Sequence, residues 1–397
     1  MRRNLFYIAI AAITMAAFTG CSEKEDNIPV SGVTISPTTA ELITGSTLTL
    51  TATVTPENAT NTTVSWTSSN ASVASVTNGV VTGLTAGTAT ITVTTQDGNK
   101  TATCLLTVKP MPQMTMTTSK ASVMVQLSGS GTATVDWGDG TNATYPLSSS
   151  SSTCNHSYSG SSAHTITIKG ENITWLRCTE NQLTALDVSK NTALTELWCY
   201  NNQLTVLDVS KNTALTELWC YNNQLTTLDV SKNTELTVLG CRENQLTALD
   251  VSKNTALTNL DCRHNQLTVL DVSNNTALTQ LYCRFNQLTA LDVSKKNTAL
   301  TYLNCGNNQL TALDVSKNTA LTQLLCSGNQ LTALDVSKNT ALGILYCENN
   351  QLTTIALNAL FGTLHGNGGR IWIGGNSGAA DCDRSIAENK GWTVYDD

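Results

Sequence analysis

Histidine is scarce in this chain of 397 residues, and its scarcity limits the chemistry that the chain can perform. The four histidines lie at positions 156, 164, 264 and 365, far apart along the chain. No Ser/His/Asp or Cys/His arrangement and no zinc-type spacing includes them. We therefore expect no enzymatic activity, no metal site and no cofactor.

Positive charge and long apolar runs are also in short supply. The formal net charge is −7 and no basic segment stands out, which argues against nucleic acid as a partner. The apolar run at the start of the chain, Leu5 to Phe18, is too short to cross a bilayer. Two arginines precede this run and small residues follow it, which is the pattern of a secretory signal.

The signal ends in Phe18-Thr19-Gly20-Cys21, which resembles the lipobox of bacterial lipoproteins. The resemblance implies that residues 1–20 are removed and that Cys21 is acylated, so that lipid alone anchors the chain to a membrane. Residues 21–28 then form an acidic tether that is similar to the surface-export signal of some outer-membrane lipoproteins. This similarity implies export through the inner membrane to the cell surface. Alternatively, the acidic charge only keeps the anchor solvated.

Cysteine, by contrast, recurs with a fixed period, which changes the meaning of every residue in the repeat. Successive cysteines are 21 residues apart, with one interval of 22 where a second lysine follows Lys295. Because one added residue leaves the next copy intact, we expect the Ser-Lys-Asn stretch of each copy to be a surface turn. The members of this cysteine ladder are Cys178, Cys199, Cys220, Cys241, Cys262, Cys283, Cys305, Cys326 and Cys347.

Each copy matches the leucine-rich-repeat pattern, with cysteine in the last apolar position of the strand. Leu194, Leu197 and Cys199 carry the pattern in the second copy, and a second Leu-x-x-Leu-x-Val run follows. Two extended segments leave no room for a long helix, so the pattern predicts a slim, mostly β coil. The array resembles the cysteine-bearing 21-residue repeats of the internalin family of bacterial surface adhesins, as nine coils over residues 171–356. This resemblance implies binding of an extracellular protein or glycan through the concave sheet.

The cysteine ladder admits more than one interpretation. Metal ligands converge on one point, whereas these thiols form a line, one in each coil, directed into the core. Neighbouring coils could bring two thiols within disulfide range, but a parallel ladder of identical side chains favours packed free thiols. A second ladder, from Asn181 and Asn202 to Asn350, is expected to bond the backbone at each turn.

Variation among the copies is confined to one face of the predicted sheet. Side chains alternate along a strand, so the neighbours of Leu197 and Cys199 point outward. Aromatic residues make up only 5% of the chain, yet they gather on this face in the first coils, and arginines follow them. The candidate ligand-binding residues are Trp175, Arg177, Trp198, Tyr200, Trp219, Tyr221, Arg242, Arg263, Tyr282, Arg284, Tyr302 and Tyr346.

The composition of this face favours binding. Aromatic and arginine side chains dominate binding hot spots, and large exposed apolar patches usually mark contact surfaces. The alternative is that recent duplication copied the aromatic residues, which then only stabilise neighbouring strands.

The segment before the repeats is rich in Ser and Thr, and short alternating runs such as Leu48 to Val54 are typical of a β-sandwich. Within it, residues 64–93 resemble the bacterial Ig-like domain of group 2, with Trp66 in its expected position. We expect this domain to span residues 29–109. The dipeptide Asp97-Gly98 predicts a hairpin turn before its last strand.

Residues 113–170 resemble a PKD-type β-sandwich, because they carry the sequence VDWGDGT at 135–141 and His156 after it. Asp136 and Asp139 could hold calcium, but two carboxylates are few for an ion that takes about six to eight oxygens. The motif favours turn formation by Asp and Gly. His156 is then a packed or hydrogen-bonded partner.

Residues 357–397 leave the repeat period. A solenoid needs a cap, because its last coil would otherwise expose its core and an unpaired sheet edge. We expect a helix over 358–364, a strand over 370–374, a second helix over 383–390 and a final strand through Trp392.

Together these features predict a mainly β protein with two N-terminal β-sandwich domains, a leucine-rich-repeat solenoid and a small α/β C-terminal cap. The leading hypothesis for its function is an adhesin-like, non-enzymatic surface protein that binds a protein partner through the concave sheet. The second is a glycan-binding lipoprotein whose aromatic side chains stack on sugar rings. The third is a structural surface component without a specific ligand.

Overall fold

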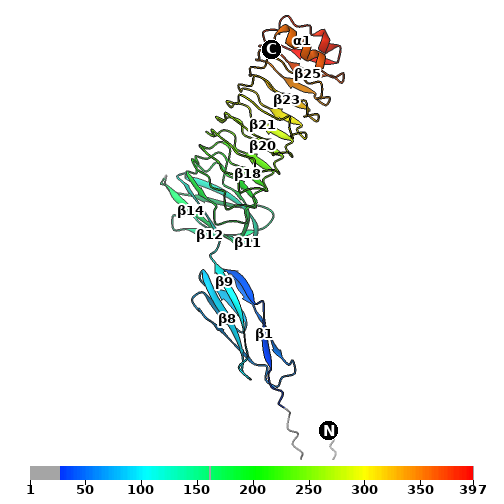
Figure 1. The fold of residues 1–397 in the computed structure, drawn as a ribbon. Coiled ribbons are helices and arrows are strands. Elements are labelled where there is room, and N and C mark those ends of the chain that lie inside the picture. The colour runs from blue at the N-terminus through cyan, green and yellow to red at the C-terminus, as the bar shows by residue number, and fades with distance from the viewer. Residues whose placement is uncertain (1–26, 161, 397) are drawn as a thin grey trace, which may run out of the picture. The chain divides into compact units, whose positions relative to one another are not determined.

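The computed structural model describes residues 27–160 and 162–396, so the predicted signal peptide, Cys21 and most of the tether lie outside the described residues. The chain divides after Pro110 into two compact units, Met1–Pro110 and Met111–Asp397 (Figure 1). Both units are mainly β, as the sequence predicts. No helix in the described part is long and apolar enough to span a bilayer.

The first unit is a β-sandwich. Its strands are β1 (Gly32–Ser36), β2 (Thr39–Ile43), β3 (Thr47–Thr49), β4 (Thr51–Thr55), β5 (Val64–Ser68), β6 (Ala74–Thr77), β7 (Val80–Gly83), β8 (Gly87–Thr95) and β9 (Thr101–Lys109). They form sheets in the orders β2-β9-β8-β5, β3-β7-β6 and β1-β4. Alternate residues of the long strands face inward, so Ile91 and Leu106 are fully buried at the centre of the core.

One prediction for this sandwich, a single strand over residues 48–54, is wrong, and another, a hairpin at Asp97-Gly98, is right. The single run expected over residues 48–54 is broken at Leu50, where the chain passes from the sheet of β3 to that of β4. The buried Leu50 donates its backbone N–H to the Gly79 carbonyl at 2.8 Å. Gly79 has a φ of +80°, and a Cβ there would lie 2.8 Å from the Leu50 carbonyl oxygen, so glycine is required. The predicted hairpin at Asp97-Gly98 is confirmed, because it joins the antiparallel pair β8 and β9.

A second sandwich opens the second unit. Its strands are β10 (Gln113–Thr118), β11 (Ser122–Asp136), β12 (Asn142–Leu147), β13 (Ser152–Ser157), β14 (His164–Lys169), β15 (Asn172–Arg177) and β16 (Ala185–Asp187). The long strand β11 serves both sheets. Its first half pairs with β13 and β15, and its second half pairs with β12 and β14.

Strand β15 joins this sandwich to the solenoid. It is antiparallel to β11 on one side and parallel to the first strand of the repeats on the other. The buried residues of both segments belong to one hydrophobic cluster. The segments 113–170 and 171–356, which the sequence separates into two domains, therefore share one core. The likeness of residues 113–170 to a PKD-type domain stays a prediction.

The solenoid contributes one short strand per coil to a parallel sheet (Figure 1). These strands are β17 (Glu196–Trp198), β18 (Glu217–Trp219), β19 (Val238–Gly240), β20 (Asn259–Asp261), β21 (Gln280–Tyr282), β22 (Tyr302–Asn304), β23 (Gln323–Leu325) and β24 (Ile344–Tyr346). Equivalent residues of successive coils are in register, so Leu197 pairs with Leu218. The second extended segment of each coil forms a strand only at β16 and elsewhere stacks without a ladder.

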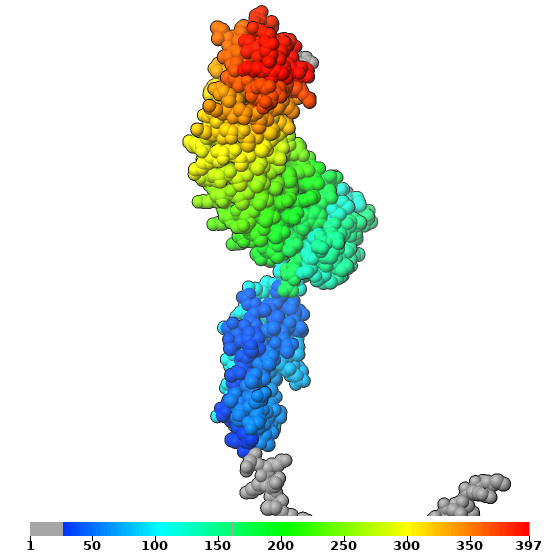
Figure 2. Space-filling model, turned by 90° about the vertical axis from the view of Figure 1, so that its right-hand side faces the viewer, coloured from blue at the N-terminus to red at the C-terminus, as the bar shows by residue number. Residues whose placement is uncertain are grey.

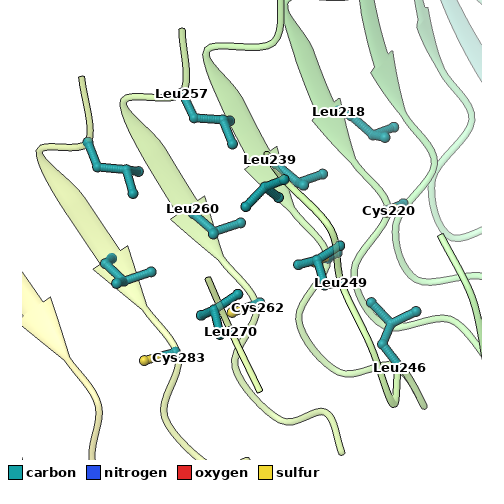
Figure 3. Packing of buried hydrophobic residues seen from close by; sticks show 14 of the residues in the cluster. Leu218, Cys220, Leu239, Leu246, Leu249, Leu257, Leu260, Cys262, Leu270 and Cys283 are labelled. Carbon is teal, nitrogen blue, oxygen red and sulfur yellow. The ribbon is translucent and has the colours of Figure 1, made fainter. Parts of the chain in front are cut away.

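Leucine and cysteine side chains fill the interior of the coils. In Figure 3, Leu218, Leu239 and Leu260 stand beside one another on consecutive strands, with Leu246 and Leu249 on the other side of the coil. All nine ladder cysteines are fully buried in this cluster, as the sequence predicts. Because each coil repeats the same side chains at the same positions, one packing solution serves the whole array.

Buried asparagines tie each coil to its neighbour. In the predicted ladder, the Asn202 Oδ1 accepts from the backbone N–H groups of Asn181 and Leu183, both at 3.0 Å. Its Nδ2 donates at 3.0 Å to the carbonyls of Cys178 and Cys199. The amide thus satisfies backbone groups that the short strand leaves unpaired.

A second asparagine ladder was missed by the sequence analysis, which placed the Ser-Lys-Asn stretch on the surface. The lysines are exposed, but the asparagines are buried; they are Asn191, Asn212, Asn233, Asn254, Asn275, Asn297, Asn318 and Asn339. The Asn233 Nδ2 donates to the carbonyls of Val209 at 3.0 Å and Asn212 at 2.8 Å in the preceding coil. A polar residue after lysine looks like a solvated turn in sequence, which hides this role.

The C-terminal segment closes the end of the solenoid (Figure 2). It consists of α1 (Thr354–Thr363), β25 (Gly369–Trp372), α2 (Ser385–Glu388) and β26 (Trp392–Tyr395). All four predicted elements are present, although α1 begins four residues earlier than expected, where Thr353 caps it by accepting from the Ala356 N–H. The Lys390 ammonium donates to three carbonyls at the end of α1.

Strands β25 and β26 do not form a separate sheet. They continue the parallel sheet of the coils in register, with Tyr346 paired to Trp372 and Trp372 to Tyr395. The parallel sheet therefore runs from β15 to β26, two strands beyond the predicted repeats.

The second asparagine ladder gives a direct prediction. Replacement of Asn233 by alanine removes two buried hydrogen bonds, to the carbonyls of Val209 and Asn212, each of which keeps one backbone N–H donor, so we expect the unfolding free energy to fall by about 1–3 kcal/mol. The neighbouring Lys232 is exposed, and Lys232→Ala should change it by less than about 0.5 kcal/mol. Urea unfolding followed by circular dichroism measures both. Equal effects of the two substitutions would contradict the role of the ladder.

Candidate binding face

The exposed side of the parallel sheet, from β15 to β26, is termed the binding face here. On β17, Leu197 and Cys199 point into the core while Glu196, Trp198 and Tyr200 are half-buried on the outer side. The same alternation holds in the other coils, because successive side chains of a strand point to opposite sides. All twelve candidate residues named from the sequence are half-buried on this face.

A shallow groove lies over the second to fifth coils. The rings of Tyr200 and Tyr221 stack at 4.3 Å with 8° between their planes, and Trp219 meets Tyr221 edge-on at 6.3 Å. The Arg242 guanidinium lies 4.2 Å from the centre of the Tyr221 ring. We call this hollow of about 430 Å³ the aromatic–arginine groove; it is lined by Trp198, Tyr200, Glu217, Trp219, Tyr221, Arg242, Asp261 and Arg263.

One glycine leaves room for the Trp219 ring in the groove. Gly240 occupies the position that Trp219 has in the preceding coil. A Cβ on Gly240 would lie 2.3 Å from the Cε3 atom of Trp219, so the indole ring lies directly over the glycine. The Trp219 Nε1 also donates to the Glu217 carboxylate at 3.2 Å. These contacts fix the orientation of the ring.

Two arginines of the face, Arg242 and Arg263, form ion pairs with acidic side chains. Arg263 donates from two nitrogens to the Asp261 carboxylate, at 2.9 and 2.8 Å. Arg242 lies 3.6 Å from the same carboxylate. Asp261 is only 7% exposed. Its carboxylate is therefore buried beside the two arginines, where charge-assisted hydrogen bonds are strong. The expected arginine stripe is therefore a mixed-charge surface.

The remaining candidates fall into three groups along the face. Trp175 meets Trp198 edge-on at 5.4 Å, and Arg177 reaches the Tyr200 hydroxyl at 3.4 Å, so both adjoin the groove. In the middle of the face, Tyr282 and Tyr302 have ring centres 4.7 Å apart. The Arg284 guanidinium lies 4.4 Å from the centre of the Phe285 ring. Tyr346 lies at the far end of the binding face.

Sequence analysis missed the continuation of the face beyond Tyr346. Trp372 stacks on Tyr346 at 4.1 Å and 5°, and Tyr395 stacks on Trp372 at 4.7 Å and 14°. Both residues lie outside the 21-residue period, so the repeat gave no signal for them. The alternation Trp-Ile within Arg370 to Gly374 was the available hint.

Sequence analysis also missed a pair of residues at the strand exits. His264 and Phe285 have positive φ values of 52° and 54° at a position where other copies carry asparagine, glutamate or glycine, and their rings stack at 4.4 Å. Bulky residues rarely adopt this conformation. Phe285 is 38% exposed, so its ring adds apolar surface at the edge of the face.

The thiols of the cysteine ladder are unsuited to chemistry. In the described structure none of them is in a disulfide. Burial raises the pKa of every ladder thiol, to about 12 for Cys178, Cys220 and Cys305. The nucleophile and metal ligand is the thiolate, which these surroundings disfavour.

The two aspartates considered as calcium ligands, Asp136 and Asp139, form hydrogen bonds within their own turns. The Asp136 Oδ1 accepts from the Gly138 N–H at 3.0 Å, and the Asp139 Oδ1 accepts from the Thr141 N–H at 3.0 Å. The hydrogen bonds from Thr141, and then His156 at 2.7 Å from the second Asp139 oxygen, lower the pKa of this carboxyl. Within residues 27–160 and 162–396, no three His, Cys, Asp or Glu side chains gather in a way that could hold a metal.

Three family models match segments of the chain. Residues 29–106 match the bacterial Ig-like domain (group 2). Residues 192–233 and 276–318 match the leucine-rich repeats model, and residues 262–282 match the LVIVD repeat. The chain therefore combines a group 2 Ig-like domain with leucine-rich repeats.

Solved structures and curated proteins give a consistent result. The functional domain of InlJ from Listeria monocytogenes, which includes a cysteine ladder, is 42% identical with a TM-score of 0.51 over 56% of this chain and 49% of that chain. An Ig-like virion protein of Serratia phage KSP90 is 49% identical over 83 residues, 20% of this chain and 32% of the phage protein. The chain thus spans about half of one relative and a third of the other. Its repeats are internalin-like.

The buried thiols predict a loss of stability in alkali. An unfolded thiol ionises near pH 8.5, whereas burial keeps the pKa of a ladder thiol such as Cys220 at about 12. Since the folded pKa is raised, the stabilisation is complete below about pH 8.5 and is lost as pH rises toward 12, by about 1.4 kcal/mol per pH unit and thiol.

Replacement of Cys220 and Cys241 by valine should therefore make the decline of unfolding free energy between about pH 9 and pH 11 shallower by two such increments. Urea titrations at stepped pH, with a phosphine reductant present, measure the slope. All other titrating groups are common to both proteins, so an unchanged slope would show that the thiols ionise in the folded state.

Proposed function

We propose that this protein is a non-enzymatic, adhesin-like surface protein that binds a protein partner through the aromatic–arginine groove. The observation that carries the proposal is the groove itself. Aromatic and arginine side chains gather in the coils whose interior is otherwise repeated without change. Such side chains supply most of the energy of protein–protein contacts.

The side chains of the groove are held in place before a partner binds, which favours tight binding over a small area. Ordering rotamer-rich side chains on binding costs about 0.5–1.5 kcal/mol each. Here Trp219 is held by Gly240 and Glu217, and Arg242 is held by Tyr221 and Asp261. These side chains therefore lose much of their conformational freedom on folding, and little more on binding.

The charges of the groove support specificity. Arg242 and Arg263 lie on either side of Asp261, so the surface offers donors and acceptors side by side. A partner with complementary charges is favoured, and one with like charges in the same place is rejected. A long acidic or basic ligand is disfavoured, because the surface does not carry charge of one sign.

The proposed location follows from the start of the chain. We propose that Cys21 is acylated and that the lipid anchors the protein at the outer membrane with the repeats outside the cell. This part of the proposal rests on the lipobox-like sequence before Cys21. The internalin-like repeats support an extracellular surface role, and leucine-rich and Ig-like families are typically non-enzymatic binding scaffolds.

The proposal is tested by probing an array of purified extracellular and cell-surface proteins with the full chain. We expect at least one protein to bind, and Trp219→Ala with Arg242→Ala to weaken binding by about a hundredfold or more, as hot-spot losses do. Gly240→Val should also weaken it, because it displaces Trp219 without removing a groove side chain. Hits that depend on the groove should persist on a parallel array of enzymatically deglycosylated proteins.

The matched control replaces two exposed valines outside the sheet. Val206 and Val269 are 72% and 70% exposed, and Val206→Ala with Val269→Ala should leave binding unchanged. An empty array, or equal binding by the groove variant, would contradict the proposed function and favour a structural role for the aromatic stack.

A further inference from the structure

A second hollow lies on the binding face, where the sandwich of residues 113–170 meets the first coils. Its volume is about 840 Å³, within the usual range for small-molecule sites. Trp175 on β15 and Trp198 on β17 contribute its aromatic surface, and the serine-rich loop of residues 148–152 contributes to one wall. We call this hollow the Trp–Ser cleft.

A β-bulge shapes the cleft beside the serine-rich loop, where the Gly129 N–H donates to the Ser148 carbonyl at 3.0 Å. The register between β11 and β15 shifts between Ser128 and Gly129, and both residues line the cleft. A Cβ on Gly129 would lie 1.9 Å from the carbonyl oxygen of Asn172, so only glycine permits this approach of the two strands. Bulges of this kind often lie beside functional sites, where they redirect side chains.

The serine loop divides its hydroxyls between two tasks. The Ser148 hydroxyl donates to the Ser150 carbonyl at 2.9 Å, and the Ser152 hydroxyl bonds the Pro146 carbonyl, so these residues stabilise the loop. Ser149 and Ser151 instead line the cleft and are exposed. With the side chains of Asn172 and two threonines, they place several donors and acceptors around the indole rings.

The charge of the cleft limits what it can accept. Glu196 is the one charged residue among its lining residues, and no Lys or Arg is among them. Burial, and then the nearby Glu217, raise the pKa of the Glu196 carboxyl. An anionic ligand would meet no cation here and would lie against a carboxylate.

We propose that the Trp–Ser cleft binds a neutral oligosaccharide. The C–H faces of a pyranose ring carry partial positive charge and stack on the electron-rich faces of tryptophan. Trp175 and Trp198, with ring planes 79° apart, present two differently oriented surfaces for such contacts. Sugar hydroxyls pair with the surrounding hydroxyls and amide, whereas a lipid or other apolar ligand would leave these groups unpaired.

This inference goes beyond the proposed function. The aromatic–arginine groove lies over later coils, and the two hollows share only Trp198 among their lining residues. A protein and a glycan could therefore bind to separate parts of the face. Variants that avoid Trp198 distinguish the failure of one proposal from the failure of the other.

The test probes a glycan array with the full chain and then measures affinity by calorimetry. The array carries neutral gluco-, manno-, galacto- and xylo-oligosaccharides beside sialylated and sulfated ones, and a peptide array is probed in parallel. We expect binding to at least one neutral class, and Trp175→Ala should weaken it by about tenfold or more, the loss of one aromatic platform.

Two loop variants keep the test independent of folding. Ser149→Arg places a bulky side chain in the cleft from an exposed loop position and should abolish glycan binding, whereas Ser150→Arg, outside the cleft lining, should retain it. Trp219→Ala should also retain glycan binding. The proposal is overturned if no neutral oligosaccharide binds at millimolar concentration, if only acidic glycans or peptides bind, or if Ser149→Arg binds as the wild type does.

Discussion

Register between coils is held by buried amides, and the binding face depends on it. Each short strand supplies only a few backbone hydrogen bonds, so the groups around it need other partners. The first asparagine ladder provides such partners, as Asn202 illustrates, and the second adds further bonds from coil to coil, as Asn233 illustrates. An amide in the same position of every coil requires the chain to return to that position after each copy. The fixed period of the sequence reflects this requirement.

The constrained interior leaves one surface free to vary. Leu197 and its equivalents must fit the core, whereas Trp198, Trp219 and Gly240 occupy one outward position in three successive coils and differ in size. Variation in size creates relief, because a large ring can lie over a glycine on the next strand. The aromatic–arginine groove arises in this way, from substitutions at outward positions that leave the packing of the core unchanged.

Much of the fold could be predicted because the repeat is local and regular. The 21-residue period indicated the coils, the buried thiols and the outward positions of residues such as Trp198 and Tyr200. What the sequence did not indicate depends on contacts between distant segments. The pairing of β11 with β15 joins residues about fifty positions apart and merges two predicted domains into one core. The stack of Trp372 on Tyr346 and the charge balance of Arg242 and Asp261 likewise appear only in three dimensions.

Hydrogen exchange measured by mass spectrometry shows whether the coils fix the binding face before any ligand arrives. In the free protein, the backbone N–H groups of Cys199, Cys220 and Cys241 donate to the next coil at 2.8–2.9 Å. We expect slow exchange of these amides, uniform from β17 to β24, in the absence of any partner. Rapid exchange confined to the coils of residues 196–242 would instead show that the groove is not preformed.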